Sequence, residues 1–131
     1  MPHITIEYSA NLADAIDMPA LVERVHETAL ASGPFSRAAA RTRAVERRCY
    51  RIADGRPDAA FIHIVMRIGH GRNLATKRMA GEAVFAALVD ETDPLLKARP
   101  IGLTLEIHDI PPDTVWRKNT MHSLFGSAPP Q

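Results

Sequence analysis

Hydrophobic and polar residues recur with two different periods in the first half of the chain. Over His3–Tyr8, β-branched residues alternate with polar ones, which predicts a strand. Residues 20–30 carry apolar side chains at helical spacing, Asp17 can cap the free amides before them, and a Ser-Gly-Pro sequence ends the pattern, so a helix is predicted there. We interpret Arg41–Ile52 as a second strand, while Ala38–Ala40 also fit the extension of a short helix.

The second half of the chain repeats this order. A turn rich in Asp, Gly and Pro at residues 53–57 precedes the apolar run Ala60–Ile68, which predicts a strand. Asn73 can cap a helix whose apolar positions extend over residues 74–89, and Pro94 lies beyond its end. Apolar and polar residues then alternate strictly over Ile101–His108, which predicts a half-buried strand.

Two strand-helix-strand repeats, residues 3–52 and 60–108, therefore make up most of the chain, and residues 109–131 follow them. We expect one domain over residues 1–131 with an α/β (α+β) fold, in which a four-stranded mixed sheet carries two helices on one face. The other face needs a cover that two helices cannot supply, so we expect a second subunit to pack on it.

The C-terminal segment is polar and rich in turns at first. It contains four possible apolar anchors, which are Trp116, Met121, Leu124 and Phe125. We expect the last residues, Ser127–Gln131, to be frayed.

Composition is that of a soluble globular protein of 131 residues, with 46% hydrophobic and 24% charged residues. No apolar run approaches the ~20 residues of a membrane span and the N-terminus lacks a secretory signal, so we expect a cytoplasmic protein with no membrane partner. The single cysteine, Cys49, permits no internal disulfide and is interpreted as a buried small residue. None of the six histidines has the helical spacing of a zinc motif, so we expect no metal site.

Charge is balanced overall but concentrated locally. The chain has 16 basic and 15 acidic residues, yet six arginines crowd into one short segment: Arg37, Arg41, Arg43, Arg47, Arg48 and Arg51. They form either a solvated face or a site for an anion. An alternative hypothesis takes residues 37–48 as a helix whose basic stripe binds nucleic acid, but the balanced charge, the 5% aromatic content and the lack of a known motif argue against a nucleic-acid partner.

Pro2 stands directly before the first strand. Initiator methionine is usually removed when the second side chain is small, and its removal leaves the secondary amine of proline at the N-terminus. An α-amino group titrates near ~7.7 to 8.0, and burial or nearby arginines lower its pKa because both disfavour the cation. Pro2 is therefore a candidate base for proton transfer at carbon. If Met1 is retained, the Pro2 nitrogen is a tertiary amide without basicity.

Several short motifs resemble those of one known family in their order and spacing. They are Pro2-His3 with Glu7, Ser9 and Asn11-Leu12, the turn Ala53-Asp54-Gly55, the loop Ile68-Gly69-His70-Gly71-Arg72, the segment Ala80-Gly81-Glu82, and Asn119 with His122, Leu124 and Phe125. Together they resemble the 5-carboxymethyl-2-hydroxymuconate Δ-isomerase family of the tautomerase superfamily, whose relatives include 4-oxalocrotonate tautomerase and macrophage migration inhibitory factor. The resemblance covers nearly the whole chain, although no single motif is specific.

This resemblance implies a homotrimer of doubled βαβ subunits whose sheets face a central barrel-like core. It implies that Pro2, freed of Met1, transfers a proton within a dienol during homoprotocatechuate (4-hydroxyphenylacetate) catabolism, without metal or organic cofactor. The family's two arginines that bind its small polycarboxylate substrate correspond to Arg41 and Arg72. Arginine suits this role because a guanidinium can bind a carboxylate with two hydrogen bonds. Arg43 can face the same way as Arg41 on a strand and can assist or substitute for it.

One alternative keeps the tautomerase fold but changes the reaction. The first half of the chain holds more arginine than the family pattern leads us to expect, which leaves the substrate open. On this alternative the protein acts on another enol or binds a ligand without catalysis.

Overall fold

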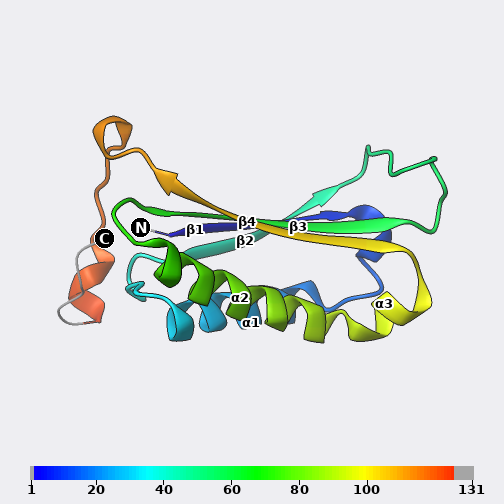
Figure 1. The fold of residues 1–131 in the computed structure, drawn as a ribbon, viewed down its shortest axis with the longest axis horizontal. Helices are drawn as coiled ribbons and strands as arrows, with labels where there is room; N and C mark the ends of the chain where they lie inside the picture. Colours follow the sequence, from blue (N-terminus) through cyan, green and yellow to red (C-terminus); the bar gives the residue numbers. More distant parts are fainter. Residues whose placement is uncertain (1, 126–131) are drawn as a thin grey trace.

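Four strands form one mixed sheet in the computed structural model, which describes residues 2–125. The strands are β1 (His3–Ser9), β2 (Arg41–Arg47), β3 (Ala60–Gly69) and β4 (Ile101–Ile110), in the spatial order β2-β1-β3-β4 (Figure 1). β1 pairs parallel with β2 and antiparallel with β3, and β3 pairs parallel with β4. The predicted four-stranded mixed sheet is confirmed.

Two long helices, α1 (Met18–Ser32) and α2 (Leu74–Glu91), lie along the same face of the sheet, as predicted (Figure 1). Each helix connects two parallel strands, because a parallel pair needs a crossover connection. Both predicted N-caps are confirmed. The side chains of Asp17 and Asn73 each accept a hydrogen bond from the amide three residues later, at 3.1 and 2.8 Å.

The core lies between these helices and the strand residues that face them. Its fully buried large side chains are Ile4 and Ile6 of β1, Ile62, Ile64, Met66 and Ile68 of β3, Leu21 and Val25 of α1, and Val84 and Leu88 of α2. Strand alternation leaves the remaining strand residues on the opposite face, which neither long helix covers. We call it the open face. It carries His3, Thr5, Glu7, Arg41, Arg43, Val45, Arg47, Phe61, His63, Val65, Arg67, Thr104, Glu106 and His108.

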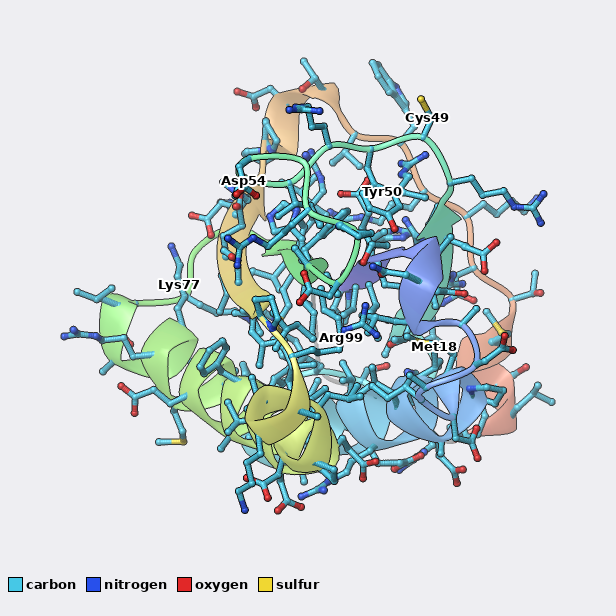
Figure 2. All side chains as sticks on the ribbon, turned by 90° about the vertical axis from the view of Figure 1, so that its right-hand side faces the viewer. Met18, Cys49, Tyr50, Asp54, Lys77 and Arg99 are labelled. Atoms are coloured by element: carbon cyan, nitrogen blue, oxygen red, sulfur yellow. The ribbon has the colours of Figure 1, made fainter. Side chains whose placement is uncertain are left out.

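The second strand is shorter than predicted. It ends at Arg47 rather than at Ile52, because its partner residue in β1 is Ser9, where β1 itself ends and no backbone remains to pair with. Residues 48–59 form a loop instead, in which the Tyr50 ring packs edge-on against Phe61 of the open face. The interpretation of Cys49 as a buried residue is wrong, since this residue is exposed at the outer bend of that loop (Figure 2).

Four short elements were not predicted. They are the helix α3 (Asp93–Ala98) and the 3-10 helices η1 (Ala10–Leu12), η2 (Pro112–Thr114) and η3 (Met121–Leu124). In α3, Pro94 occupies the first turn of a new helix, where proline is tolerated, instead of only marking the end of α2.

The predicted C-terminal anchors are exposed within this chain, with 86% of Trp116 and 74% of Leu124 open to solvent. Met121 and Phe125 are also exposed. The prediction for Ser127–Gln131 lies outside the described residues. Among the helices formed by residues 2–125, none combines the length and apolar character needed to cross a bilayer.

Candidate active site

Pro2 is buried at the start of β1, at the end of the sheet where β2 begins and β3 ends (Figure 1). Its carbonyl oxygen accepts a hydrogen bond of 3.0 Å from the amide of Arg41. The loop that carries Arg72 leaves β3 at this same end, because β1 and β3 are antiparallel. The topology therefore brings the elements of Pro2, Arg41 and Arg72 together, although the three are far apart in the sequence.

Arg41 lies on the open face, since it pairs with His3 and alternates with residues that face α1. Its side chain is half-buried, and one guanidinium nitrogen donates a hydrogen bond to the carbonyl of Ala39. In residues 2–125 no carboxylate pairs with this guanidinium. The cation thus keeps hydrogen-bond donors for an external anion.

Arg72 follows Gly71, whose φ of +99° is a conformation that glycine adopts without strain. The guanidinium donates to the carbonyl of Gly69 at 3.0 Å and to that of Pro34 at 3.2 Å, and it lies 5.5 Å from the centre of the Phe35 ring. Among residues 2–125, its buried Nε finds no acceptor. Arg72 therefore ties the end of β3 to the segment before β2, while part of its donor capacity stays unused.

The turn formed by residues 36–40 connects these two arginines. The amides of Ala39 and Ala40 both donate to the carbonyl of Ser36. In the described part of the chain, the buried hydroxyl of Ser36 has no hydrogen-bond partner. From the C-terminal segment, the Asn119 side chain donates to the carbonyl of Ala38 at 2.9 Å. The same side chain accepts from the amide of Met121 at 2.9 Å, which fixes the start of η3. The C-terminal segment is thereby fastened beside Pro2.

Positive charge gathers on the open face next to Pro2. Burial, followed by the charges of Arg43, Arg41 and Arg67, holds the pKa of His3 below its ordinary value. A guanidinium nitrogen of Arg43 lies 2.9 Å from Nδ1 of His3, so a neutral imidazole accepts this hydrogen bond. The three arginines make the surroundings of His3, one residue from Pro2, positively charged.

Arg67 was missed in the sequence. It pairs with His3 across β1 and β3, and its side chain is exposed on the open face. A signal was present, because Arg67 is the only Asp, Glu, Lys or Arg in the run 60–69, which is apolar apart from Arg67 and His63. What the sequence could not show was its partner, since antiparallel register places residues 3 and 67 side by side only in the folded sheet.

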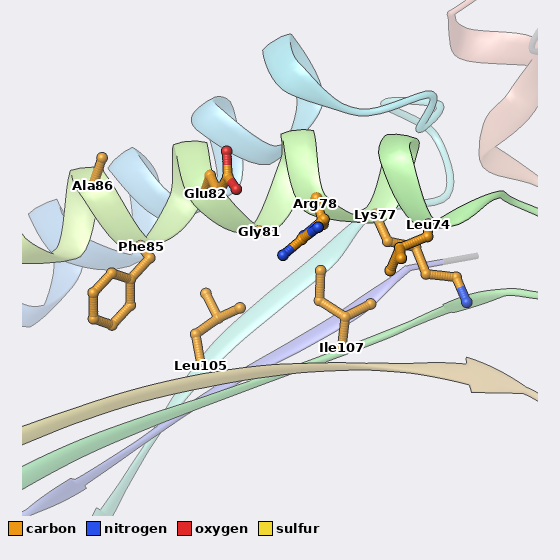
Figure 3. A pocket seen from close by; sticks show the side chains of 9 residues that line it. All are labelled: Leu74, Lys77, Arg78, Gly81, Glu82, Phe85, Ala86, Leu105 and Ile107. Atoms are coloured by element: carbon orange, nitrogen blue, oxygen red, sulfur yellow. The ribbon is translucent and has the colours of Figure 1, made fainter.

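A separate groove of about 510 Å³ lies between α2 and β4 (Figure 3). Leu105 and Ile107 point from β4 toward α2, where Gly81 permits close approach: a Cβ there would meet Ile107 at 3.0 Å. None of the three predicted site residues lines this groove. Within the described residues, no cluster of three His, Cys, Asp or Glu side chains is placed to hold a metal.

Sequence comparison decides the family. A model of the 5-carboxymethyl-2-hydroxymuconate isomerase family matches residues 2–125, which include Pro2, Arg41 and Arg72. The chain belongs to the 5-carboxymethyl-2-hydroxymuconate isomerase family. It is 34% identical over 125 residues to 5-carboxymethyl-2-hydroxymuconate Delta-isomerase of Escherichia coli, an alignment that covers 95% of this chain and 99% of that protein.

Solved structures agree with this family assignment. A 5-carboxymethyl-2-hydroxymuconate isomerase from Deinococcus radiodurans R1 superposes with a TM-score of 0.90 at 32% identity, covering 96% of this chain and 95% of its own. More distant structures share the fold alone. A fused 4-OT described as a symmetric trimer has a TM-score of 0.60 at 18% identity and covers 83% of this chain and 85% of its own. The predicted tautomerase-like fold is confirmed.

Proposed function

We propose that this protein is an isomerase that converts 5-carboxymethyl-2-hydroxymuconate by cofactor-independent proton transfer. Family membership over residues 2–125 supports this substrate and reaction class. The observation that carries the proposal is the gathering of Arg41, Arg43 and Arg67 around His3 on the open face, one residue from buried Pro2. It suits an anionic substrate and a base that must be neutral near working pH.

In the proposed mechanism, Pro2 is the N-terminal residue after removal of Met1. Its secondary amine takes the proton of the 2-hydroxyl group, and the released electron pair forms the C2 carbonyl as the double bonds shift along the chain. The resulting ammonium returns the same proton to a carbon farther along the conjugated system. One proton leaves oxygen and one arrives at carbon, so the substrate is isomerised without a net change in composition.

Arg41 and Arg72 bind the substrate carboxylates in this proposal. Guanidinium-carboxylate pairs are charge-assisted and bidentate, so they orient the dienol as well as hold it. Negative charge grows on the 2-oxygen during proton removal, and a nearby guanidinium stabilises it in the transition state. The same cations destabilise the protonated form of Pro2, which keeps part of the amine neutral.

We propose a homotrimer as the working form. The uncovered open face and the exposed Trp116 and Leu124 support an oligomer, because large apolar side chains are rarely left exposed together without a partner. The fused 4-OT relative described as a trimer shares this fold. Balanced charge supports a small polycarboxylate rather than nucleic acid as partner, and the basic stripe of the alternative hypothesis does not form because residues 41–47 are a strand. One unpaired cysteine supports a cytoplasmic location.

Two measurements on one purified sample test the proposal. Intact mass shows whether Met1 is removed, and an ultraviolet assay follows loss of the conjugated dienol with a panel of hydroxymuconates and simple enols. We expect turnover of 5-carboxymethyl-2-hydroxymuconate, and we expect alkylation of the terminal amine to abolish it. Pro2→Ala leaves a primary amine, so it should weaken turnover. Full activity after alkylation, or with Met1 retained, rules out Pro2 as the base.

A further inference from the structure

The open face divides into two halves with different charge balance. Away from Pro2, side-chain contacts link all four strands: Arg47 lies 2.6 Å from Glu7, Glu7 3.7 Å from His63, and His63 2.9 Å from Glu106. Glu106 also contacts His108 at 2.6 Å, and His108 pairs in register with Arg67, so on β4 these contacts continue toward the Pro2 end. Both carboxylates of this network, Glu7 and Glu106, have hydrogen-bonding partners, so another subunit can cover the network at modest cost.

The half beside Pro2 is not balanced. Arg41 and Arg43 of β2 and Arg67 of β3 flank His3 of β1, and within residues 2–125 none of these three arginines pairs with a carboxylate. Covering unpaired guanidinium groups with the like charges of another copy is costly. This half therefore suits contact with solvent or with an anion.

We propose that Arg43, His3 and Arg67 form a second carboxylate subsite, which binds the carboxymethyl group of the substrate. The inference rests on the proposed function and deepens it: Arg41 and Arg72 hold the carboxylates of the muconate chain, and the new subsite recognises the third. On this proposal, the preference for a substrate with a carboxymethyl group depends on residues other than Arg41 and Arg72.

Spacing on the sheet supports a separate subsite. Residues two apart on a strand are about 6.6 Å apart, and neighbouring strands about 4.8 Å apart. Arg43 thus lies about 6.6 Å from Arg41 along β2, and Arg67 lies about 9.6 Å from Arg41 across β1, so these side chains can contact different carboxylates of one substrate. Because Nδ1 of His3 accepts a hydrogen bond from Arg43, its Nε2 carries a hydrogen that can be donated to a carboxylate.

Comparing two substrates distinguishes binding at this subsite from a general attraction of anions by positive charge. The first is 5-carboxymethyl-2-hydroxymuconate, and the second is 2-hydroxymuconate, which lacks the carboxymethyl group. For Arg67→Gln and Arg43→Gln, we expect KM for the first substrate to rise roughly 10- to 100-fold, as loss of a charge-assisted hydrogen bond predicts. KM for the second substrate should rise much less, because this substrate loses only the general attraction of one positive charge and no hydrogen bond. Arg47→Gln is the matched control, since it removes the same charge from the same face of β2 and should leave the ratio of the two KM values unchanged.

A binding measurement keeps the two proposals distinguishable. Calorimetric titration with tricarballylate, an unreactive tricarboxylate, should give weaker binding to Arg67→Gln than to wild type, and glutarate should bind both alike. If wild type turns over neither muconate, the proposed function fails while tricarballylate still tests the subsite. Equal KM changes on both substrates, equal tricarballylate affinity, or dissociation of the Arg67→Gln oligomer with loss of both activities overturns the inference.

Discussion

Ser9→Ala tests a hydrogen-bonded junction at the end of the sheet opposite Pro2. The buried Ser9 hydroxyl accepts a hydrogen bond from the amide of Phe61 at 3.0 Å and donates one to Oδ1 of Asn11 at 2.7 Å. Asn11 in turn donates to the carbonyl of Ala59 at 2.7 Å. Ser9 and Asn11 belong to the motifs that carry the family resemblance, and their contacts assign them a structural role.

The expected loss of stability follows from two groups that lose their partners. An unsatisfied buried polar group costs about 1–3 kcal/mol, and for two partly buried groups the lower bound gives about 2 kcal/mol in total. Unfolding entropy of about 2.1 cal/mol/K per residue amounts to roughly 0.28 kcal/mol/K for 131 residues. The melting temperature should therefore fall by about 7 °C.

Thermal unfolding followed by circular dichroism at fixed protein concentration measures this shift. Ser123→Ala is the control, since it removes a hydroxyl that makes one exposed hydrogen bond, and it should change the melting temperature by less than about 2 °C. Turnover below the transition should be unchanged, because seven residues of strand separate Ser9 from Pro2 by about 23 Å. A Ser9→Ala shift no larger than that of the control, or loss of activity in a stable variant, refutes this reasoning.

Three further predictions concern acid, the C-terminal segment and the Arg72 loop. Hydrogen bonds from His108 and His63 lower the pKa of Glu106, so the ionised carboxylate stabilises the fold above its ordinary pKa and this stabilisation is lost as pH falls through the lowered pKa. On acidification, the denaturation midpoint of Glu106→Gln should therefore fall less than that of the wild type. Midpoints that fall equally in the two proteins would contradict this prediction. Asn119→Asp keeps the side-chain oxygen that accepts from the amide of Met121 in η3, but it loses the side-chain NH2 group that donates to the turn 36–40. Hydrogen-deuterium exchange followed by mass spectrometry should show faster amide exchange over residues 38–41, and kcat/KM should fall about fivefold. The control Ser123→Ala should change neither quantity. Gly71→Ala places a residue with a Cβ at a backbone position of positive φ, which costs about 1–2 kcal/mol. The substitution should lower the melting temperature, and it should raise KM because it displaces Arg72. A melting temperature and a KM equal to those of the wild type would contradict this prediction.

The sequence by itself determined the elements, because their signals are local. Alternation over His3–Tyr8 and 101–108, helical spacing after Asp17 and Asn73, and the two caps all follow from contacts within a few residues. The repeated order of these elements was enough to predict a mixed sheet with both helices on one face. The family also followed from the chain alone, since the order and spacing of its short motifs are properties of the sequence.

Only the tertiary structure decided which residues meet. The end of β2 at Arg47 depends on where β1 stops, so residues 48–52 could not be excluded from the strand by their own pattern. The placement of Arg67 beside His3 depends on antiparallel register, which joins residues 64 positions apart. Charge balance on the open face likewise arises from cross-strand pairs, because ion pairing depends on distance in space and a local sequence pattern does not contain it.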